Sequence, residues 1–421
     1  DSDVHVLASC AVVAVGVARQ PFHDRRVDQV DHLVRPGEPR PRRGVAREAK
    51  GPVVVLHLAD VVGAALDGGA GEERTLAANM GDFAAIRIRQ RVLVDASRVD
   101  TGALLLGESC ALPLALAPVG LAGMMARRGE ARAARVAEEA GVPFTLSTVG
   151  VCPLKEVAAA RGAPFWFQLY MLRDRGAVEA ILDVAWAAGC RTLVFTVDLP
   201  LPGPRHRDAR NGLGTPGLRA SLLRASQVLS RPRWIWDVAL RGRPLRFGCL
   251  ETQLPGARGL DEFRAWIDTQ FAPGVTWRDI DWLRARWRGK LLLKGLLDVE
   301  DACASADAGV EAIVVSNHGG RQLDSVASGI RALPKIAAAV GDRCEILVDG
   351  GVRSGTDLFK ALALGARGAL AGRAWIWALA GAGEAGLRNW LDTVQRELRL
   401  TMTLAGVTRT ADINASHLDT D

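Results

Sequence analysis

From residue 112 onward, short apolar runs alternate regularly with longer segments of helical spacing. The runs are rich in Val, Ile, Leu and Phe and have the length of strands that are buried on both faces. We predict eight strands, at 112–118, 143–147, 165–170, 192–198, 290–295, 311–318, 345–351 and 368–373. Parallel strands of this kind require a helix in each connection.

The segments between these strands are rich in alanine, and their apolar residues recur at the spacing of an amphipathic helix. The clearest helices are expected at 128–140, 175–188, 299–308 and 355–364, each followed by a glycine, the residue that commonly ends a helix. No GxGxxG motif opens the first unit. Eight strand-then-helix units therefore predict a (β/α)8 TIM barrel rather than an open doubly wound sheet.

Two segments depart from this repeat. Residues 199–289 form a long insertion after the fourth strand, rich in Pro, Arg and Trp, of the kind that usually makes a lid or a partner surface. Its Trp234 and Trp236 are compatible with core packing or with an aromatic and basic surface resting on a membrane. Residues 1–66 show neither helical nor strand periodicity in their apolar positions. We interpret them as an atypical N-terminal extension that is either loosely ordered or the product of DNA translated in the wrong reading frame. The barrel domain is expected at 67–421.

Composition narrows the class of protein. Hydrophobic residues make up 49% of the chain and charged residues 24%, which is typical of a globular protein with a sizeable core. A net charge of +6 is small for 421 residues and argues against a nucleic-acid partner. The seven cysteines stand singly without CxxC spacing, so neither a disulfide framework nor a metal site is predicted.

Polar and small residues at the strand ends are the candidate site, because the carboxyl ends of all strands in a barrel open at one mouth. These residues are Pro118, Ser147, Gln168, Tyr170, Thr196, Asp198, Lys294, Ser316, His318, Arg321, Asp349, Gly351, Arg353, Gly372 and Arg373. A polar residue at the end of a single strand is weak evidence for an active site. A lone histidine such as His318 is often only a hydrogen-bonded turn residue. A set with a His, an Asp, a Lys and several arginines indicates an active site.

The last two strand ends, 349–353 and 372–373, combine glycines with arginines. Small residues let backbone N–H groups approach an anion, and arginines donate charge-assisted hydrogen bonds. This is also the usual place for a phosphate in barrels. We therefore predict a cofactor that carries a phosphate.

Other strand ends suit the ring of such a cofactor. Ser147, Gln168 and Thr196 are neutral donors and acceptors that match the edge of a heteroaromatic ring. Lys294 is the exception, since a cation beside the ring would stabilise negative charge that develops on it. A reducible flavin requires this as it accepts electrons.

The remaining residues suit a small acid substrate. Histidine titrates near neutrality in general, so His318 is the natural general base, and Asp198 can stabilise its protonated form. Arg205 and Arg321 can hold a carboxylate in bidentate fashion. Tyr170 is the only tyrosine of the chain. We expect it to form a hydrogen bond to the substrate rather than merely to pack.

Several motifs together resemble the FMN-dependent α-hydroxy-acid dehydrogenase family. They are SNHGGRQLD at 316–324, APVG at 117–120, FQLY at 167–170, TVD at 196–198 and LKG at 293–295. Within the family, the stretches 145–149, 151–153 and 172–176 resemble the bacterial, quinone-linked branch that oxidises L-lactate. The similarity extends from about residue 67 to about residue 412.

The resemblance implies that the chain binds FMN and oxidises L-lactate to pyruvate, with electrons passed to the respiratory quinone pool. It implies that His318 removes a proton from the substrate and that Asp198 supports it, whether the α-hydrogen leaves as hydride or as a proton. Arg205 and Arg321 would bind the carboxylate, and Tyr170 would contact the substrate. The implied FMN contacts are Pro118, Ser147, Gln168, Thr196, Lys294 (at the N1/O2 edge), Ser316, Asp349, Gly351, Arg353, Gly372 and Arg373. A homo-oligomer is implied, with peripheral attachment to the cytoplasmic face of the bacterial inner membrane through residues 199–289.

One departure from the family pattern leaves alternatives open. Family members carry a substrate-contacting tyrosine two residues before an Asp-Gly-Gly turn, whereas this chain has Ala65 before Asp67-Gly68-Gly69. An FMN-binding barrel impaired by its N-terminus is therefore one alternative. The others are a mandelate dehydrogenase, a 2-hydroxy-acid oxidase that uses O2, and a phosphate-binding isomerase without flavin. The last of these gives no role to Arg205, His318 and Arg321.

Overall fold

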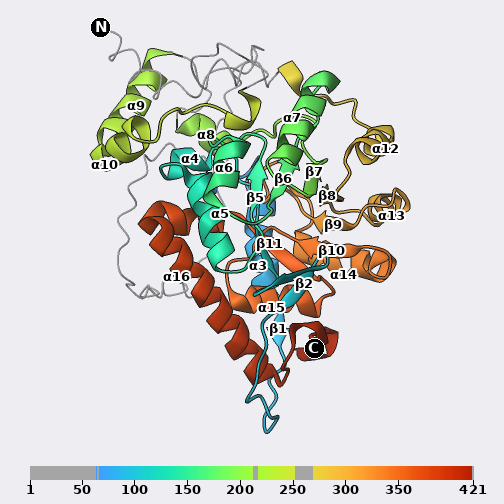
Figure 1. Cartoon of the computed structure of the whole chain (residues 1–421). Helices are drawn as coiled ribbons and strands as arrows, with labels where there is room; N and C mark the ends of the chain where they lie inside the picture. Colours follow the sequence, from blue (N-terminus) through green and yellow to red (C-terminus); the bar gives the residue numbers. More distant parts are fainter. Residues whose placement is uncertain (1–62, 64–65, 212–216, 252–268, 420–421) are drawn as a thin grey trace, which may run out of the picture.

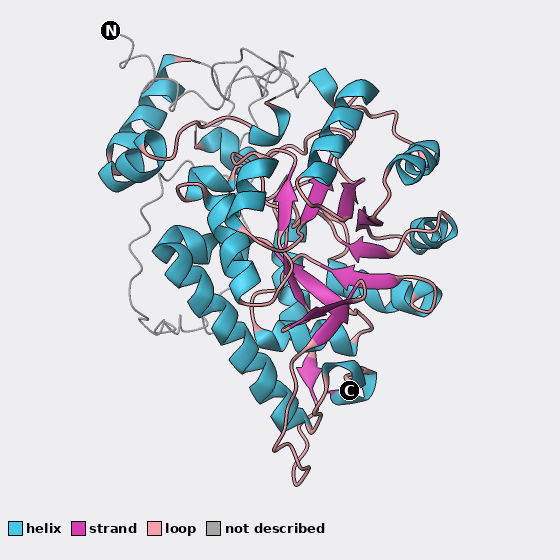
Figure 2. Ribbon diagram, in the orientation of Figure 1, coloured by secondary structure: helices cyan, strands magenta, loops and turns pink. Residues whose placement is uncertain are grey.

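The computed structural model describes residue 63 and residues 66–211, 217–251 and 269–419 (Figure 1). Most of the expected N-terminal extension, Ala65 included, lies outside the described residues. Within them, a ring of strands occupies the centre and helices surround it (Figures 1 and 2).

The strands of the ring are all parallel. They are β4 (Leu114–Leu116), β5 (Thr145–Ser147), β6 (Trp166–Leu169), β7 (Thr192–Thr196), β8 (Lys290–Leu296), β9 (Ala312–Val315), β10 (Glu345–Val348) and β11 (Gly368–Ala371). They pair in the order β4-β11-β10-β9-β8-β7-β6-β5. A parallel bridge between Leu116 and Phe144 brings β4 beside the start of β5 and closes the ring. The predicted (β/α)8 barrel is confirmed.

The helices follow the strands in the expected alternation. They are α4 (Ala122–Met125) and α5 (Gly129–Glu139), α6 (Leu154–Ala160), α7 (Arg175–Ala187), α12 (Trp277–Arg286), α13 (Val299–Asp307), α14 (Gly329–Val340), α15 (Gly355–Ala363) and α16 (Arg373–Ala405), which is kinked at Ala382 and Gly383. The predicted stops at Gly141, Gly189, Gly309 and Gly365 have φ values of 64°, 91°, 71° and 101°. Glycine enters this left-handed region without the steric cost that other residues meet.

The barrel is a packed core. Alternate strand residues point to its axis, among them Trp166, Val194, Leu292 and Leu347, and the others face the helices. A hairpin of β2 (Ala103–Leu105) and β3 (Glu108–Cys110) contributes side chains to the same inner cluster. The Leu106 N–H donates to Glu345, the first residue of β10. The hairpin therefore closes the amino-terminal end of the barrel, and the carboxyl end is left for chemistry.

The insertion after β7 forms helices of its own. They are α8 (His206–Arg210), α9 (Leu218–Leu229), α10 (Pro232–Trp234), a π-helix at Ile235–Leu240 and a 3-10 turn at Gly248–Leu250. α9 and α10 stand apart from the ring at the upper left of Figure 1, whereas α12 belongs to the ring as the helix of the fourth unit. The two tryptophans differ. Trp234 is 2% exposed and donates to the Met124 carbonyl, whereas Trp236 is 62% exposed.

The two ends of the described chain are tied to the barrel. Helix α3 (Arg74–Ala85) leads into β1 (Arg87–Ile88), which pairs antiparallel with β12 (Leu418–Asp419) after the turns Thr410–Asp412 and Ala415–His417. α3 contacts α14 and the loop before it. None of the helices that the structure describes is both long and apolar enough to cross a bilayer.

Candidate active site

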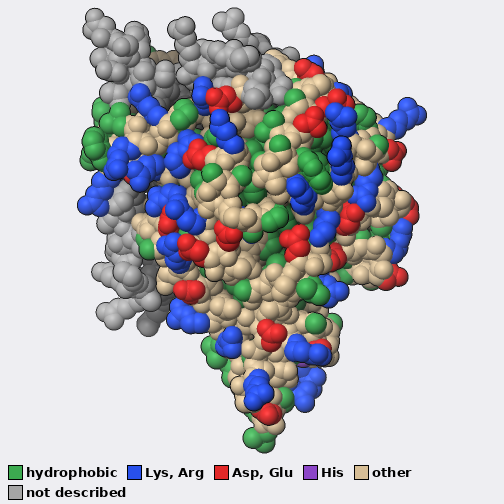
Figure 3. All heavy atoms as spheres, in the orientation of Figure 1, with side chains coloured by type: hydrophobic (Ala, Val, Ile, Leu, Met, Phe, Trp, Pro, Cys, Tyr) green, Lys and Arg blue, Asp and Glu red, His purple; other side chains and the backbone are tan. Residues whose placement is uncertain are grey.

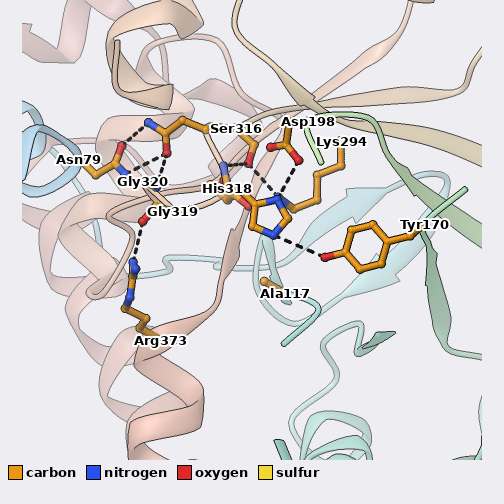
Figure 4. A network of polar contacts seen from close by, with 12 residues as sticks. Asn79, Ala117, Tyr170, Asp198, Lys294, Ser316, His318, Gly319, Gly320 and Arg373 are labelled. Carbon is orange, nitrogen blue, oxygen red and sulfur yellow. Dashed lines mark hydrogen bonds and ion pairs between the residues drawn. The ribbon is translucent and has the colours of Figure 1, made fainter. Parts of the chain in front are cut away.

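The candidate site lies at the carboxyl ends of the strands, where the loops after β6, β7, β8 and β9 converge (Figure 4). His318 follows β9, and its Nδ1 lies 2.7 Å from Asp198 Oδ1 after β7. Its Nε2 lies 3.5 Å from the hydroxyl of Tyr170 after β6, and the two rings stack at a 19° interplanar angle. The structure therefore brings together three residues that the sequence had placed only by their strand ends.

Electrostatics suit these three groups to proton transfer. Burial would raise the pKa of Asp198, but the charge and hydrogen bond of His318, with Lys294 nearby, leave it below its usual value. Asp198 is therefore a carboxylate that stabilises a protonated imidazole. Burial, reinforced by Asp198, raises the pKa of Tyr170, so its phenol stays neutral.

Lys294, on β8, is a buried cation with a fixed partner. Its Nζ lies 2.8 Å from Asp349 Oδ2 and donates to Ser316 Oγ at 2.8 Å. Burial opposes the charge, yet Asp349 and Asp198 raise the pKa of Lys294 above its usual value. The ammonium is thus held charged at the end of the barrel axis, where it can stabilise negative charge on a bound group.

Arginines make one side of the site strongly positive. Burial, reinforced by Arg205 and Arg373, lowers the pKa of Arg321 to about 9. Several cations in one buried region attract an anion such as a carboxylate. Arg321 also donates to the Leu66 and Gly68 carbonyls, at 3.3 and 2.6 Å.

Arg373 has partners that the sequence did not indicate. Its guanidinium donates to the carbonyls of Leu66, Gly68 and Gly319 at 3.0 to 3.3 Å. The side chain therefore joins the N-terminal segment to the loop of His318. A phosphate near Arg373 would instead meet the backbone N–H groups at the start of α16, where Gly372 is the N-cap.

The residues expected at a flavin ring leave buried polar atoms available. Ser147 Oγ donates to Gln168 Oε1 at 3.0 Å. The Nε2 of the same amide does not take part in this hydrogen bond. Gln168 Nε2 and Thr196 Oγ1 are buried and find no hydrogen-bond partner within the described part of the chain. Buried donors of this kind normally have partners. These two atoms and the Lys294 cation fit the polar edge of an FMN ring.

The phosphate end also fits. Gly350 and Gly351 have φ values of 82° and 107°, and a side chain at Gly351 would collide with the carbonyl of Asn79, 2.1 Å away. The following Arg353 is exposed, with its backbone N–H bound to Asp357. Pro118 follows β4, which pairs with β11, so it lies two strands away from β10 along the barrel mouth. Gly350 and Gly351 thus form a turn without side chains, and the cation of Arg353 follows it, as phosphate binding requires.

The comparisons with known proteins agree with this geometry. A model of the FMN-dependent dehydrogenase family matches residues 57–420. The chain belongs to this family, and FMN is its cofactor.

Relatives and solved structures extend the match over most of the chain. An L-lactate dehydrogenase of Caulobacter vibrioides (strain NA1000 / CB15N) is 54% identical over 353 residues, 84% of this chain and 92% of that protein. An L-lactate dehydrogenase of Stenotrophomonas maltophilia (strain R551-3) is 51% identical over 84% of this chain and 93% of its own. The solved structure of a monotopic membrane protein, (S)-mandelate dehydrogenase, has a TM-score of 0.81 at 32% identity and covers 87% of this chain and 97% of that one.

Some residues around the site had no role assigned from the sequence. Gln322 lies within the SNHGGRQLD motif, and its Nε2 donates to the carbonyls of Asp198 and Leu201 at 2.9 and 3.0 Å. Its Oε1 accepts from the Gly203 N–H at 3.1 Å. Gln322 thereby fixes the chain that runs from Asp198 toward Arg205. Its place four residues after His318 was the one available signal.

Gly295 allows Asp198 to approach β8. It has φ 114°, and a Cβ there would lie 2.5 Å from Asp198 Cγ. We expect Gly295→Ala to displace the carboxylate and to lower turnover by roughly a hundredfold, because a displacement of about 1 Å has this effect in a catalytic group. Steady-state rates with a dye acceptor measure it.

The matched control is Gly309→Ala. Gly309 also has a left-handed φ, 71°, but no atom lies within 4 Å of the added Cβ. This variant carries the backbone strain without the collision with Asp198. Equal losses of turnover in the two variants would contradict the positioning role of Gly295.

Proposed function

We propose that the protein oxidises L-lactate to pyruvate and delivers the electrons to a membrane quinone. Support comes from the hydrogen-bonded pair of His318 and Asp198 beside buried arginines, a geometry suited to removing a proton from a small hydroxy acid. The relatives of about 50% identity that carry the name L-lactate dehydrogenase favour this substrate.

The proposed roles follow from the contacts. His318 Nε2 faces the substrate side and takes the proton, while Asp198 stabilises the imidazolium through Nδ1. Arg321 and Arg205 bind the carboxylate, and the neutral Tyr170 donates a hydrogen bond to the substrate. Bound FMN supplies the two-electron acceptor that this oxidation needs.

We propose that Lys294, Gln168, Thr196 and Ser147 hold the ring of FMN and that Ser316 and Pro118 complete this part of the site. Ser316 Oγ accepts from Lys294 and, at 3.0 Å, from the His318 N–H. It therefore links the cation proposed for the flavin ring to the loop of the proposed base. The phosphate end is assigned to Asp349, Gly351, Arg353, Gly372 and the backbone of Arg373. The barrel domain that carries these residues is taken to run over 67–421.

The flavin spectrum tests this function directly. Purified protein is expected to be yellow, and anaerobic L-lactate should bleach its absorbance. Rates with L-lactate, mandelate and glycolate, each with O2 or a quinone analogue as acceptor, then rank the substrates. Faster bleaching by mandelate would favour the dehydrogenase of the solved neighbour, and O2 as the better acceptor would favour an oxidase. If the protein binds FMN but no hydroxy acid reduces the flavin, the result would favour the alternative of an impaired FMN-binding barrel, in which Ala65 stands in place of the family's tyrosine.

Membrane attachment is proposed through α9 and the segment after it. Leu218, Leu222 and Leu229 lie on one face of α9 and are 76%, 60% and 69% exposed, and Trp236 is 62% exposed. Hydrophobic and basic side chains gather over α9 and α10 at the upper left of Figure 3. An apolar face with flanking arginines suits the interface of an anionic bilayer. We place the protein at the cytoplasmic face of the bacterial inner membrane.

A charge on this face is expected to weaken membrane binding. Leu222→Glu should lower partitioning onto phosphatidylglycerol vesicles by about tenfold or more, since it removes one apolar anchor and adds repulsion. Leu400→Glu, at a leucine of α16 that is 59% exposed, is the matched control. Vesicle co-sedimentation of the intact protein measures both. Equal binding of the two variants would contradict docking through α9.

A homo-oligomer is proposed as well. Val92 and Leu93, in the loop that projects beyond the barrel, are 72% and 104% exposed and give an apolar surface for contact between copies. Sedimentation equilibrium of the protein, compared with Leu93→Glu, would show whether this loop holds the copies together. A monomer at micromolar concentration would contradict the proposal.

A further inference from the structure

The loop that carries the candidate base has an unusual backbone. His318, Gly319 and Gly320 are three successive residues in the left-handed region, with φ values of 59°, 66° and 73°. Glycine adopts this conformation readily, but histidine does not. Such a strained residue persists only where its surroundings hold it. The direction of the His318 ring therefore depends on whatever fixes this bend.

A pair of buried amides fixes the bend. Asn317 Oδ1 accepts from the Gly320 N–H at 3.0 Å, and Asn317 Nδ2 donates to the Ala327 carbonyl at 3.0 Å. The second lone pair and the second N–H of this amide both go to Asn79, at 2.9 and 2.8 Å. Asn79 and Asn317 are 1% and 4% exposed. Asn79 thus sets which way the Asn317 amide faces.

Helix α3 delivers Asn79 to this position. Asp324 accepts from the Glu72 and Thr75 N–H groups at 2.9 and 2.8 Å, and these bonds lower the pKa of Asp324 to about 2. One helical face therefore packs along the loop after β9, since Ser328 also donates to Asp82 at 2.5 Å. The helix is held at both ends of the contact, with Asn79 between them.

Asn79 also touches the turn assigned to the phosphate. A Cβ at Gly350 would lie 3.2 Å from Asn79 Oδ1 and 3.3 Å from Asn317 Oδ1. The Asn79 carbonyl lies against Gly351 in the same way. One residue of α3 therefore contacts both the loop of the base and the turn after β10.

We propose that Asn79 is a positioning residue that aims His318 and supports the Gly350–Gly351 turn. The proposal rests on the proposed function for the role of His318, but the amide pair itself can be tested without turnover. In this proposal α3 does more than pack on the barrel, because its Asn79 fixes the conformation of the loop that carries His318. Any change in the N-terminal segment that shifts α3 would reach the base through Asn79.

The test is Asn79→Asp, which keeps the shape of the side chain. The carboxylate can still accept from Asn317 Nδ2 but cannot donate to Asn317 Oδ1, so two acceptors face each other and the amide turns away from Gly320. We expect backbone amides in 316–321 to exchange hydrogen about tenfold faster in FMN-free protein, the effect of losing one buried hydrogen bond. In FMN-loaded protein, flavin reduction by L-lactate should slow by about tenfold or more.

The matched control is Thr75→Val on the same helix. Thr75 Oγ1 accepts from the Val326 N–H at 3.1 Å, one turn before Asn79 and away from the bend. This variant should leave exchange in 316–321 and flavin reduction close to those of the unaltered protein. Asn79→Ala, compared at the same temperature below its unfolding midpoint, should reproduce the effect of Asn79→Asp.

Two outcomes would overturn the proposal. One is unaltered exchange in 316–321 for Asn79→Asp, and the other is equal losses for Asn79→Asp and Thr75→Val. The exchange measurement uses no substrate, so it remains decisive if L-lactate is not the substrate. Absence of lactate oxidation in the unaltered protein would count against the proposed function alone.

Discussion

His318→Ala is expected to lower the rate of flavin reduction by L-lactate roughly a thousandfold, within the range for loss of a general base. The imidazole contacts both Asp198 and Tyr170. No neighbour can replace it, because the phenol of Tyr170 has a raised pKa and stays protonated. Rapid mixing under anaerobic conditions measures the rate.

FMN content and the thermal unfolding midpoint serve as controls for His318→Ala. The left-handed bend at 318–320 should be no less strained in this variant, since alanine tolerates a left-handed φ no better than histidine. Loss of the partly buried ring and of its contact with Asp198 should lower the unfolding midpoint by a few degrees. His417→Ala, at a histidine on the C-terminal turn, should leave the rate unchanged. A rate for His318→Ala within tenfold of the unaltered protein would contradict the role of base.

Lys294→Met should have the second large effect, on both stability and rate. It leaves the Asp349 carboxylate buried without its partner, which costs about 3–5 kcal/mol in the free energy of unfolding. It also removes the cation that stabilises negative charge at the ring, which should slow flavin reduction roughly a hundredfold to a thousandfold. Denaturant unfolding and rapid mixing measure the two effects separately.

A second substitution separates them. Lys294→Met with Asp349→Asn removes the unpaired charge, so most of the lost stability should return while the rate stays low. Asp349→Asn alone keeps the ammonium, which retains its contact with Ser316. Recovery of the rate together with stability in the double variant would show that Lys294 acts only by holding the fold.

Much of the fold was readable from the sequence because the repeat is local. Apolar runs such as 345–351, and helices that end at Gly141 or Gly365, report their surroundings within a few residues, and the structure confirms them. A long connection with helices of its own follows the fourth strand, as expected, although α12, within the predicted range 199–289, belongs to the ring. Its Trp234 proved to be a core residue.

The candidate residues themselves were also chosen from the sequence, since barrel geometry directs every strand end to one mouth. His318 and Asp198 are 120 positions apart, yet each follows an apolar strand with a reactive group. Their types alone indicated a base with its carboxylate. The family resemblance added FMN, which the family match supports.

Only the tertiary structure showed what holds these residues in place. Asn79 and Asn317 are 238 positions apart, and neither lies in a pattern that predicts a pair. The guanidinium of Arg373, a residue that the sequence predicted only as a phosphate contact, donates to the carbonyls of Leu66, Gly68 and Gly319. The spacing of apolar residues along the sequence indicates which face of a helix or strand is buried. Hydrogen bonds between loops depend on how the closed barrel brings distant strand ends together, and this is decided by packing.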